Sequence, residues 1–148
     1  MIAFHRAAHH PVPSSRRQTV GLAGRLLLLE DDTFVGPMLV EQLADAGYAV
    51  NLCGTLKEAR KALTEMSYQV ALIDQHLPDG TGIGFLQELR GQNNNLPVVV
   101  LSGDMFSADL RIWLHSTNAD ALSKPFVIGR LLETISRLCN ASWTGVAA

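Results

Sequence analysis

The segment VALIDQHLPDGTG, residues 70–82, joins a short apolar run to an aspartate and then to a turn that contains proline and glycine. Four consecutive apolar residues bounded by turn signals are typical of a strand buried inside a sheet. The run ends at Asp74, whose desolvation is costly unless a cation, a hydrogen-bond donor or a chemical role compensates for it. The rest of the chain must therefore supply partners for Asp74.

Short apolar runs alternate with longer segments of helical period along most of the chain. The predicted strands lie in RLLLLEDD, YAVNLC, QVALID, LPVVVLSG and ADALSK. The predicted helices lie in FVGPMLVEQLADAG, in the segment after Thr55, and in GIGFLQELRG, SADLRIWLHS and VIGRLLETISRLC. Thr55 and Glu58 have the spacing of a capping box at the start of the second helix. This alternation predicts an α/β fold, a doubly wound five-stranded parallel sheet with five helices.

The length of 148 residues fits one domain. Residues 1–24 carry arginines and histidines but no acidic residue, so we expect a flexible basic tail there, followed by a domain over residues 25–138 and a C-terminal tail over 139–148. The stretch SRRQTVGLAG also suggests a twin-arginine export signal, but Gly21 and Gly24 interrupt the apolar region that such a signal needs. We therefore prefer the tail.

Composition excludes several classes of function. The formal net charge of −2 leaves no basic footprint for nucleic acid. No apolar run approaches the roughly 18 residues of a membrane span. Two cysteines are too few for a disulfide framework and lack the spacing of a zinc site. These features predict a cytoplasmic protein with no direct contact to nucleic acid or membrane.

Functional groups gather at the predicted carboxyl ends of the strands, where open α/β sheets bind their ligands. They are Glu30, Asp31, Asp74, Ser102 and Lys124. Three converging carboxylates repel one another unless a hard divalent cation lies among them, and Mg2+ is the expected one. With the metal present, Asp74 can act as a nucleophile toward a phosphoryl group, whose oxygens Ser102 and Lys124 can bind.

Four motifs in order, LLLLEDD, LIDQHLPDGTG, VVVLSG and ALSKPF, resemble the receiver domains of bacterial two-component response regulators. The resemblance covers about residues 25–138 and implies the flavodoxin-like strand order 2-1-3-4-5. After Leu138 only CNASWTGVAA remains, which is too little for a DNA-binding or catalytic output domain. We therefore expect a stand-alone receiver, with a fragment of a longer regulator as the alternative.

The resemblance assigns a role to each residue of the predicted metal site. Asp74 becomes the phosphoacceptor and Asp31 a direct Mg2+ ligand, while Glu30 acts mainly through water. The backbone carbonyl of His76 becomes the remaining ligand, and its side chain is expected to be a loop group. Asp32 is expected to cap the first helix.

The resemblance also assigns the groups that bind phosphate. Ser102 takes the position of the switch hydroxyl, and Lys124 takes that of the phosphate-binding lysine, followed by Pro125 in a cis peptide bond. The sequence departs from the family at Ala121, where a switch tyrosine or phenylalanine is usual. Without that side chain, the usual coupling of hydroxyl movement to aromatic burial cannot operate.

These assignments predict a phosphoacceptor signalling protein that receives a phosphoryl group from a sensor histidine kinase or a histidine phosphotransfer protein. It is expected to switch contacts with a protein effector in trans, with a homodimer left open. It is not an enzyme beyond self-catalysed uptake and slow loss of phosphate. The alternatives are a scaffold that is not phosphorylated, a haloacid dehalogenase-like phosphatase, which needs an aspartate where His76 stands, and a flavodoxin-like electron carrier, whose flavin phosphate the acidic crevice would repel.

Overall fold

The computed structural model describes residues 23–147, with side chains described through residue 140. Its main sheet has five parallel strands: β1 (Arg25–Leu29), β2 (Ala49–Cys53), β3 (Val70–Asp74), β6 (Val98–Ser102) and β7 (Ala119–Ser123). Their order in the sheet is β2-β1-β3-β6-β7, which confirms the predicted order 2-1-3-4-5 of the five long strands. The predicted fold class is therefore confirmed.

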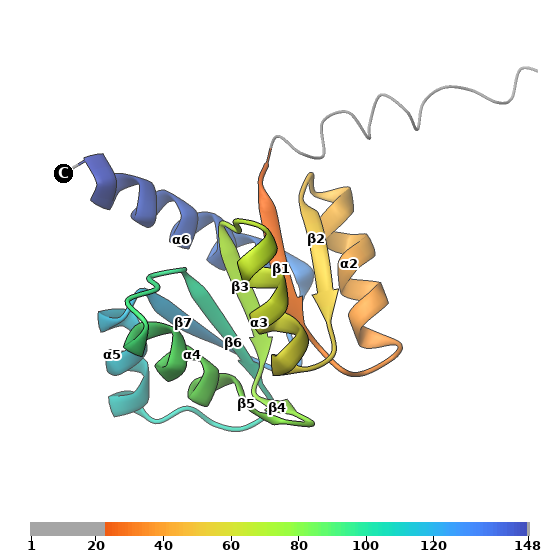
Figure 1. Cartoon of the computed structure of the whole chain (residues 1–148), viewed down its shortest axis with the longest axis horizontal. Helices are drawn as coiled ribbons and strands as arrows, with labels where there is room; N and C mark the ends of the chain where they lie inside the picture. Colours follow the sequence, from red (N-terminus) through yellow and green to blue (C-terminus); the bar gives the residue numbers. More distant parts are fainter. Residues whose placement is uncertain (1–22, 148) are drawn as a thin grey trace, which may run out of the picture.

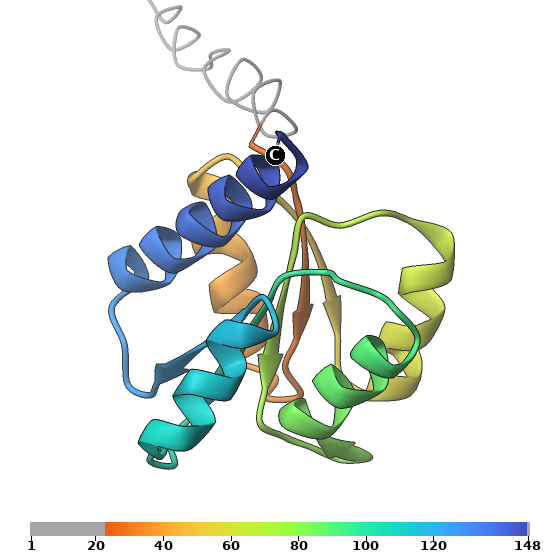
Figure 2. The same cartoon turned by 90° about the vertical axis from the view of Figure 1, so that its left-hand side faces the viewer.

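Five helices cover the two faces of this sheet (Figures 1 and 2). They are α2 (Val35–Asp45), α3 (Leu56–Glu65), α4 (Gly82–Gly91), α5 (Ala108–Ser116) and α6 (Ile128–Ala147). Side chains of α3, α4 and α5 share one apolar core with the sheet, and side chains of α2 and α6 share the other. The sheet is therefore buried on both faces, as expected for parallel strands joined by helical crossovers.

The apolar runs of the sequence explain why the central strands are buried. In β1, Leu27 and Leu29 point into the core beneath α3, α4 and α5, whereas Leu26 and Leu28 point into the core beneath α2 and α6. All four side chains are fully buried. Alternate residues of a strand face opposite sides, so a strand covered on both sides needs an unbroken apolar sequence.

Local signals in the sequence fix several helix ends. The hydroxyl of Thr55 accepts a hydrogen bond from the Glu58 amide, and the Glu58 carboxylate accepts one from the Thr55 amide, so the predicted capping box is confirmed. After α2, Gly47 has a φ of +102°, and its amide donates to the carbonyl of Ala44. Glycine adopts this left-handed conformation at little cost, so it ends the helix there.

The structure adds features that the sequence analysis did not predict. A small antiparallel hairpin of β4 (His76–Leu77) and β5 (Gly80–Thr81) follows β3. Helix α6 runs to Ala147, so it continues through most of the segment 139–148 that we assigned to a tail. On α2, Met38 is half exposed, whereas the neighbouring Leu39 is buried.

The predicted basic tail, residues 1–24, lies almost entirely outside the described residues. Among the helices of residues 23–147, none combines the length and apolar character needed to cross a bilayer.

Candidate functional site

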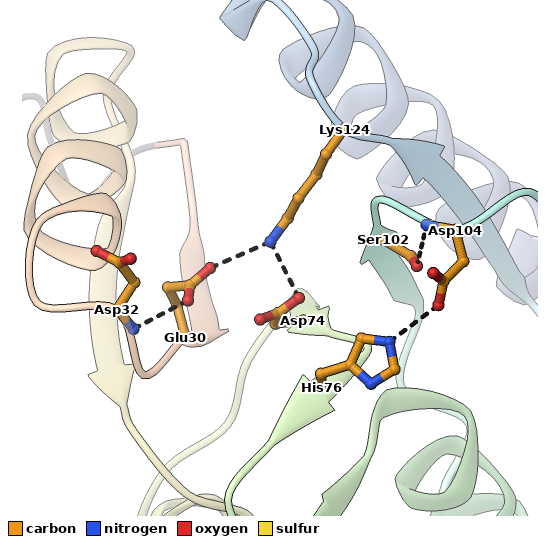
Figure 3. A network of polar contacts seen from close by, with 7 residues as sticks. All are labelled: Glu30, Asp32, Asp74, His76, Ser102, Asp104 and Lys124. Atoms are coloured by element: carbon orange, nitrogen blue, oxygen red, sulfur yellow. Dashed lines mark hydrogen bonds and ion pairs between the residues drawn. The ribbon is translucent and has the colours of Figure 1, made fainter.

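The carboxyl ends of four strands bring polar side chains to one edge of the sheet (Figure 3). Glu30 follows β1, Asp74 ends β3, Ser102 ends β6 and Lys124 follows β7. Backbone hydrogen bonds keep these ends level, because the Gln75 amide donates to the Leu101 carbonyl and the Lys124 amide to the Ser102 carbonyl. Parallel strands in register therefore collect side chains that lie far apart in the sequence.

Lys124 crosses this edge and pairs with two carboxylates. Its Nζ lies 3.0 Å from Oδ1 of Asp74 and 3.5 Å from Oε1 of Glu30. Burial alone would lower the pKa of Lys124, but the hydrogen bond to Asp74 and the negative charges of Asp74 and Glu30 raise the pKa above its usual value. The ammonium group is therefore charged at neutral pH. The expected cis peptide bond between Lys124 and Pro125 is present.

Three carboxylates at the site have the arrangement that a cation requires. Oxygens of Glu30, Asp31 and Asp74 lie within 4.8 Å of one another. Glu30 is only 4% exposed; its buried Oε1 makes no hydrogen bond and has the Lys124 ammonium 3.5 Å away, whereas its Oε2 accepts a hydrogen bond from the Asp32 amide. One ammonium group shared between Glu30 and Asp74 does not neutralise three carboxylates, and a hard cation among their oxygens would. The residues present therefore fit Mg2+.

Asp32 precedes the first helix, α2, and is not part of this carboxylate cluster. Its Oδ1 accepts hydrogen bonds from the amides of Val35 and Phe34, at 2.9 and 2.8 Å. These two bonds lower the pKa of Asp32 below its usual value. Its carboxylate points away from Glu30 in Figure 3. Asp32 therefore binds the amides that lead into α2, although the residue at the N-cap of this helix is Phe34.

Ser102 lies beside a second pair of polar groups. Its buried hydroxyl oxygen accepts a hydrogen bond from the Asp104 amide at 2.9 Å. The carboxylate of Asp104 in turn lies 2.9 Å from Nε2 of His76. The imidazole of His76 is 69% exposed and is directed toward Asp104, away from the carboxylate cluster (Figure 3). The side chain is thus exposed and apart from the cluster, as expected, but His76 lies in strand β4 and not in a loop.

Ala121 lies in strand β7, at the position where the family resemblance led us to expect tyrosine or phenylalanine. Ala121 is buried and lines a cavity of about 580 Å3 at the edge of the sheet, between α5 and α6. The neighbouring Asp120 carboxylate accepts a hydrogen bond from the Ala121 amide and contacts His115 and Arg137. Burial would raise the pKa of Asp120, but these three contacts lower it below its usual value. An ionised carboxylate therefore lies next to Ala121.

Sequence reasoning missed the partners of Asp104 and Asp120. Asp104 stands two residues beyond a strand end, and that position alone could have marked it. No comparable position marked Asp120 in the sequence. Its partner Arg137 lies 17 residues further along the chain, on helix α6, so residue spacing does not reveal the pair. Contacts of this kind depend on how the elements pack, which residue spacing does not encode.

The sequence of this chain is similar to those of a known family and of curated proteins. Residues 26–136 match the family model of the response regulator receiver domain. The probable transcriptional regulatory protein y4xI of Sinorhizobium fredii is 34% identical over 101 residues, which cover 68% of this chain and 44% of that protein. The transcriptional regulatory protein PmrA of Pectobacterium parmentieri is 32% identical over 114 residues, covering 77% and 51%. The chain thus spans about half the length of these curated relatives.

Solved structures agree with the sequence comparison. The receiver domain of the Francisella response regulator 1452 aligns with a TM-score of 0.73 at 30% identity, covering 80% of this chain and 98% of that one. The beryllofluoride-activated NtrC4 receiver domain dimer aligns with a TM-score of 0.69 at 29% identity, covering 79% and 97%. These matches confirm the resemblance found in the four motifs, and the chain belongs to the family of response regulator receiver domains.

Proposed function

We propose that this receiver domain takes up a phosphoryl group on Asp74 from a histidine kinase or a histidine phosphotransfer protein. Receiver domains are regulatory signalling domains, which agrees with the expectation of a signalling role in place of an enzymatic one. The observation that carries the proposal is the position of Asp74, 3.0 Å from the Lys124 ammonium and within 4.8 Å of the carboxylates of Glu30 and Asp31. A cation on one side and a cation-binding cluster on the other suit a carboxylate that receives a phosphoryl group.

The transfer follows from the groups at the site. An Asp74 carboxylate oxygen forms a bond to phosphorus while the bond from phosphorus to the donor's histidine nitrogen breaks. The electron pair of the broken bond stays on the imidazole, which takes up a proton. Lys124 holds Asp74 in place and provides a positive charge for the phosphoryl oxygens. Mg2+, held by Glu30, Asp31, Asp74 and the backbone carbonyl of His76, would neutralise negative charge at the site when bound.

The test is direct phosphorylation of the purified chain. Incubation with acetyl phosphate and Mg2+ should add the mass of one phosphoryl group, detected by intact-mass spectrometry and lost after treatment with hydroxylamine. An unchanged mass with acetyl phosphate, phosphoramidate and a phosphorylated histidine phosphotransfer protein would favour the alternative, a scaffold that is not phosphorylated.

Asp31→Ala should abolish Mg2+ binding and phosphorylation, because it removes one of three clustered carboxylates without touching Asp74. Calorimetric titration with Mg2+ and intact mass measure the two effects. The matched control is Asp32→Ala, which removes the adjacent acid, whose hydrogen bonds serve α2 alone. Uptake by Asp31→Ala at the parent's rate would show that the cluster is not a metal site.

The response to phosphate should be concentrated in two segments, the hairpin after β3 and the loop after β6. Ala121 has no large side chain to move, so we expect structural change at Leu77–Gly82 and Gly103–Ser107, where turn residues permit movement. Amide hydrogen exchange with and without beryllofluoride measures this change. If exchange changes most at Ala121 and α6, another group couples the site to that surface.

The output that we propose is a change in affinity for a partner protein, by contact in trans. The relatives named as transcriptional regulators are about twice as long as the matched segment, so their activity is not assigned to this chain. A cytoplasmic location stays a prediction, and homodimer formation stays open. Pull-down from lysate with the beryllofluoride-treated chain, compared with the untreated chain, identifies partners that depend on the activated state.

A further inference from the structure

The hairpin that follows Asp74 is too short to hold its own position. Each of its strands has two residues, with His76 paired to Thr81 and Leu77 to Gly80. A two-stranded hairpin is marginally stable in water even when it is longer. Its place beside Asp74 must therefore be set by contacts at its base and at its tip.

The base of the hairpin is attached to the start of α4. The Gln75 carbonyl accepts a hydrogen bond from the Gly82 amide at 3.0 Å, and the Gln75 side chain accepts one from the Ile83 amide at 2.9 Å. Gly82 also packs closely against the backbone of Asp74, because a Cβ on Gly82 would lie 3.0 Å from the Asp74 carbonyl oxygen. The base is thus fixed directly beside the site.

The tip of the hairpin is attached to a different helix, α3, through Asp79. Its Oδ1 accepts a hydrogen bond from the Leu56 amide at 2.8 Å, and its Oδ2 accepts one from the Lys57 amide at 3.0 Å. Gly80 adds close packing, because a Cβ there would lie 2.6 Å from a methyl carbon of Leu56. Figure 1 shows the hairpin beside the N-terminal end of α3.

Asp79 completes the hydrogen bonding of this helix end. The capping box of Thr55 and Glu58 satisfies the amides of those two residues. The amides of Leu56 and Lys57 are first-turn donors with no partner inside the helix, and a carboxylate is favoured there by the helix dipole. The hydrogen bonds from Leu56 and Lys57 lower the pKa of Asp79, so it is ionised at neutral pH. The link is therefore a charged one.

We propose that Asp79 is a positioning residue for cation binding at Asp74: its bonds to α3 hold the hairpin, and with it the His76 backbone, in place beside the carboxylate cluster. This inference rests on the proposed function, in which the His76 carbonyl is a Mg2+ ligand. A carbonyl ligand has no side chain of its own to direct it, so the fold must position it. α3 belongs to the apolar core and does not contribute a side chain to the carboxylate cluster.

The test compares Mg2+ affinity in the parent, Asp79→Ala and Asp79→Asn by calorimetric titration. Loss of both hydrogen bonds in Asp79→Ala should weaken Mg2+ binding by about tenfold, the usual cost of removing a group that orients a metal ligand. Asp79→Asn keeps one acceptor oxygen and should fall between Asp79→Ala and the parent. Phosphorylation by acetyl phosphate should slow at low Mg2+ and recover at saturating Mg2+.

Thr55→Ala is the matched control, because Thr55 caps the same end of α3 but its side chain makes no hydrogen bond to the hairpin. It should leave Mg2+ affinity at the parental value. Amide exchange without Mg2+ gives a readout independent of phosphorylation: the hairpin amides should exchange faster in Asp79→Ala and be unaffected in Thr55→Ala. Thermal unfolding shows that each variant is folded at the temperature used.

Two results would overturn the inference. Parental Mg2+ affinity in Asp79→Ala would show that the hairpin needs no attachment to α3. Equal weakening in Asp79→Ala and Thr55→Ala would show that α3 acts through stability alone. A parent chain that neither binds Mg2+ nor takes up phosphate would instead refute the proposed function, and the inference with it.

Discussion

Asp74→Asn is expected to remove phosphoryl uptake completely. The substitution keeps the size of the side chain but removes the negative oxygen that would bond to phosphorus, and it leaves Lys124 with Glu30 as its remaining ion-pair partner. Intact mass after incubation with acetyl phosphate and Mg2+ should show the unmodified chain alone. This is the largest functional effect that the site predicts.

Asp104→Asn is the matched control for that experiment. Asp104 lies near the site, but its carboxylate pairs with His76 and is not part of the cluster of Glu30, Asp31 and Asp74. The chain with Asp104→Asn should still end the incubation with one phosphoryl group. A phosphorylated Asp74→Asn chain would place the acceptor elsewhere, and peptide mapping would locate it.

Arg90→Ala is expected to cause the largest loss of stability. The half-buried guanidinium of Arg90 donates hydrogen bonds to backbone carbonyl oxygens in two segments, the one that follows α4 and the one that follows α5. None of its partners is a carboxylate. The acceptors are the carbonyls of Asn94, Leu96, Thr117 and Asn118 and the hydroxyl of Thr117. Removing this donor leaves several partly buried acceptors without a partner, so the free energy of unfolding should fall by about 3 kcal/mol. Urea unfolding followed by circular dichroism measures the change.

Arg60→Ala tests whether that loss is specific. Arg60 also makes two hydrogen bonds from its guanidinium, but both go to the carboxylate of Glu88, and half of the Arg60 side chain is exposed. Water replaces an exposed ion pair readily, so the free energy of unfolding should fall by less than about 1 kcal/mol. Equal losses in the two variants would mean that the carbonyl contacts of Arg90 contribute no more than a surface pair.

The parts of the fold that follow from local pattern were predictable. Unbroken apolar runs marked β3 and β6 as central strands, and the Thr55 capping box marked the start of α3. Glu30, Asp74 and Lys124 were found together because parallel strands bring their carboxyl ends to one edge. Each of these signals lies within a few residues of sequence or follows from the topology alone.

The missed features depend on packing between elements. β4 and β5 have two residues each, too few to produce a period, and Asp79 between them binds the amide of Lys57, 22 residues earlier in the chain. The carbonyl partners of Arg90 are equally invisible, since every residue except proline offers the same backbone oxygen. Such contacts are specified by the packed structure, which residue types and spacing describe only in part.

The bond between Asp120 and the Ala121 amide bears on how this protein behaves at high concentration. β7 is the last strand of its sheet, so the backbone on its outer side is available to a strand of another molecule. The Lys124 amide points toward β6, and the Ala121 amide, three residues earlier, points outward. The Asp120 carboxylate already occupies that amide, with His115 and Arg137 beside it. At the β7 edge, a strand of another molecule would therefore have to displace the Asp120 carboxylate before it could pair with the Ala121 amide.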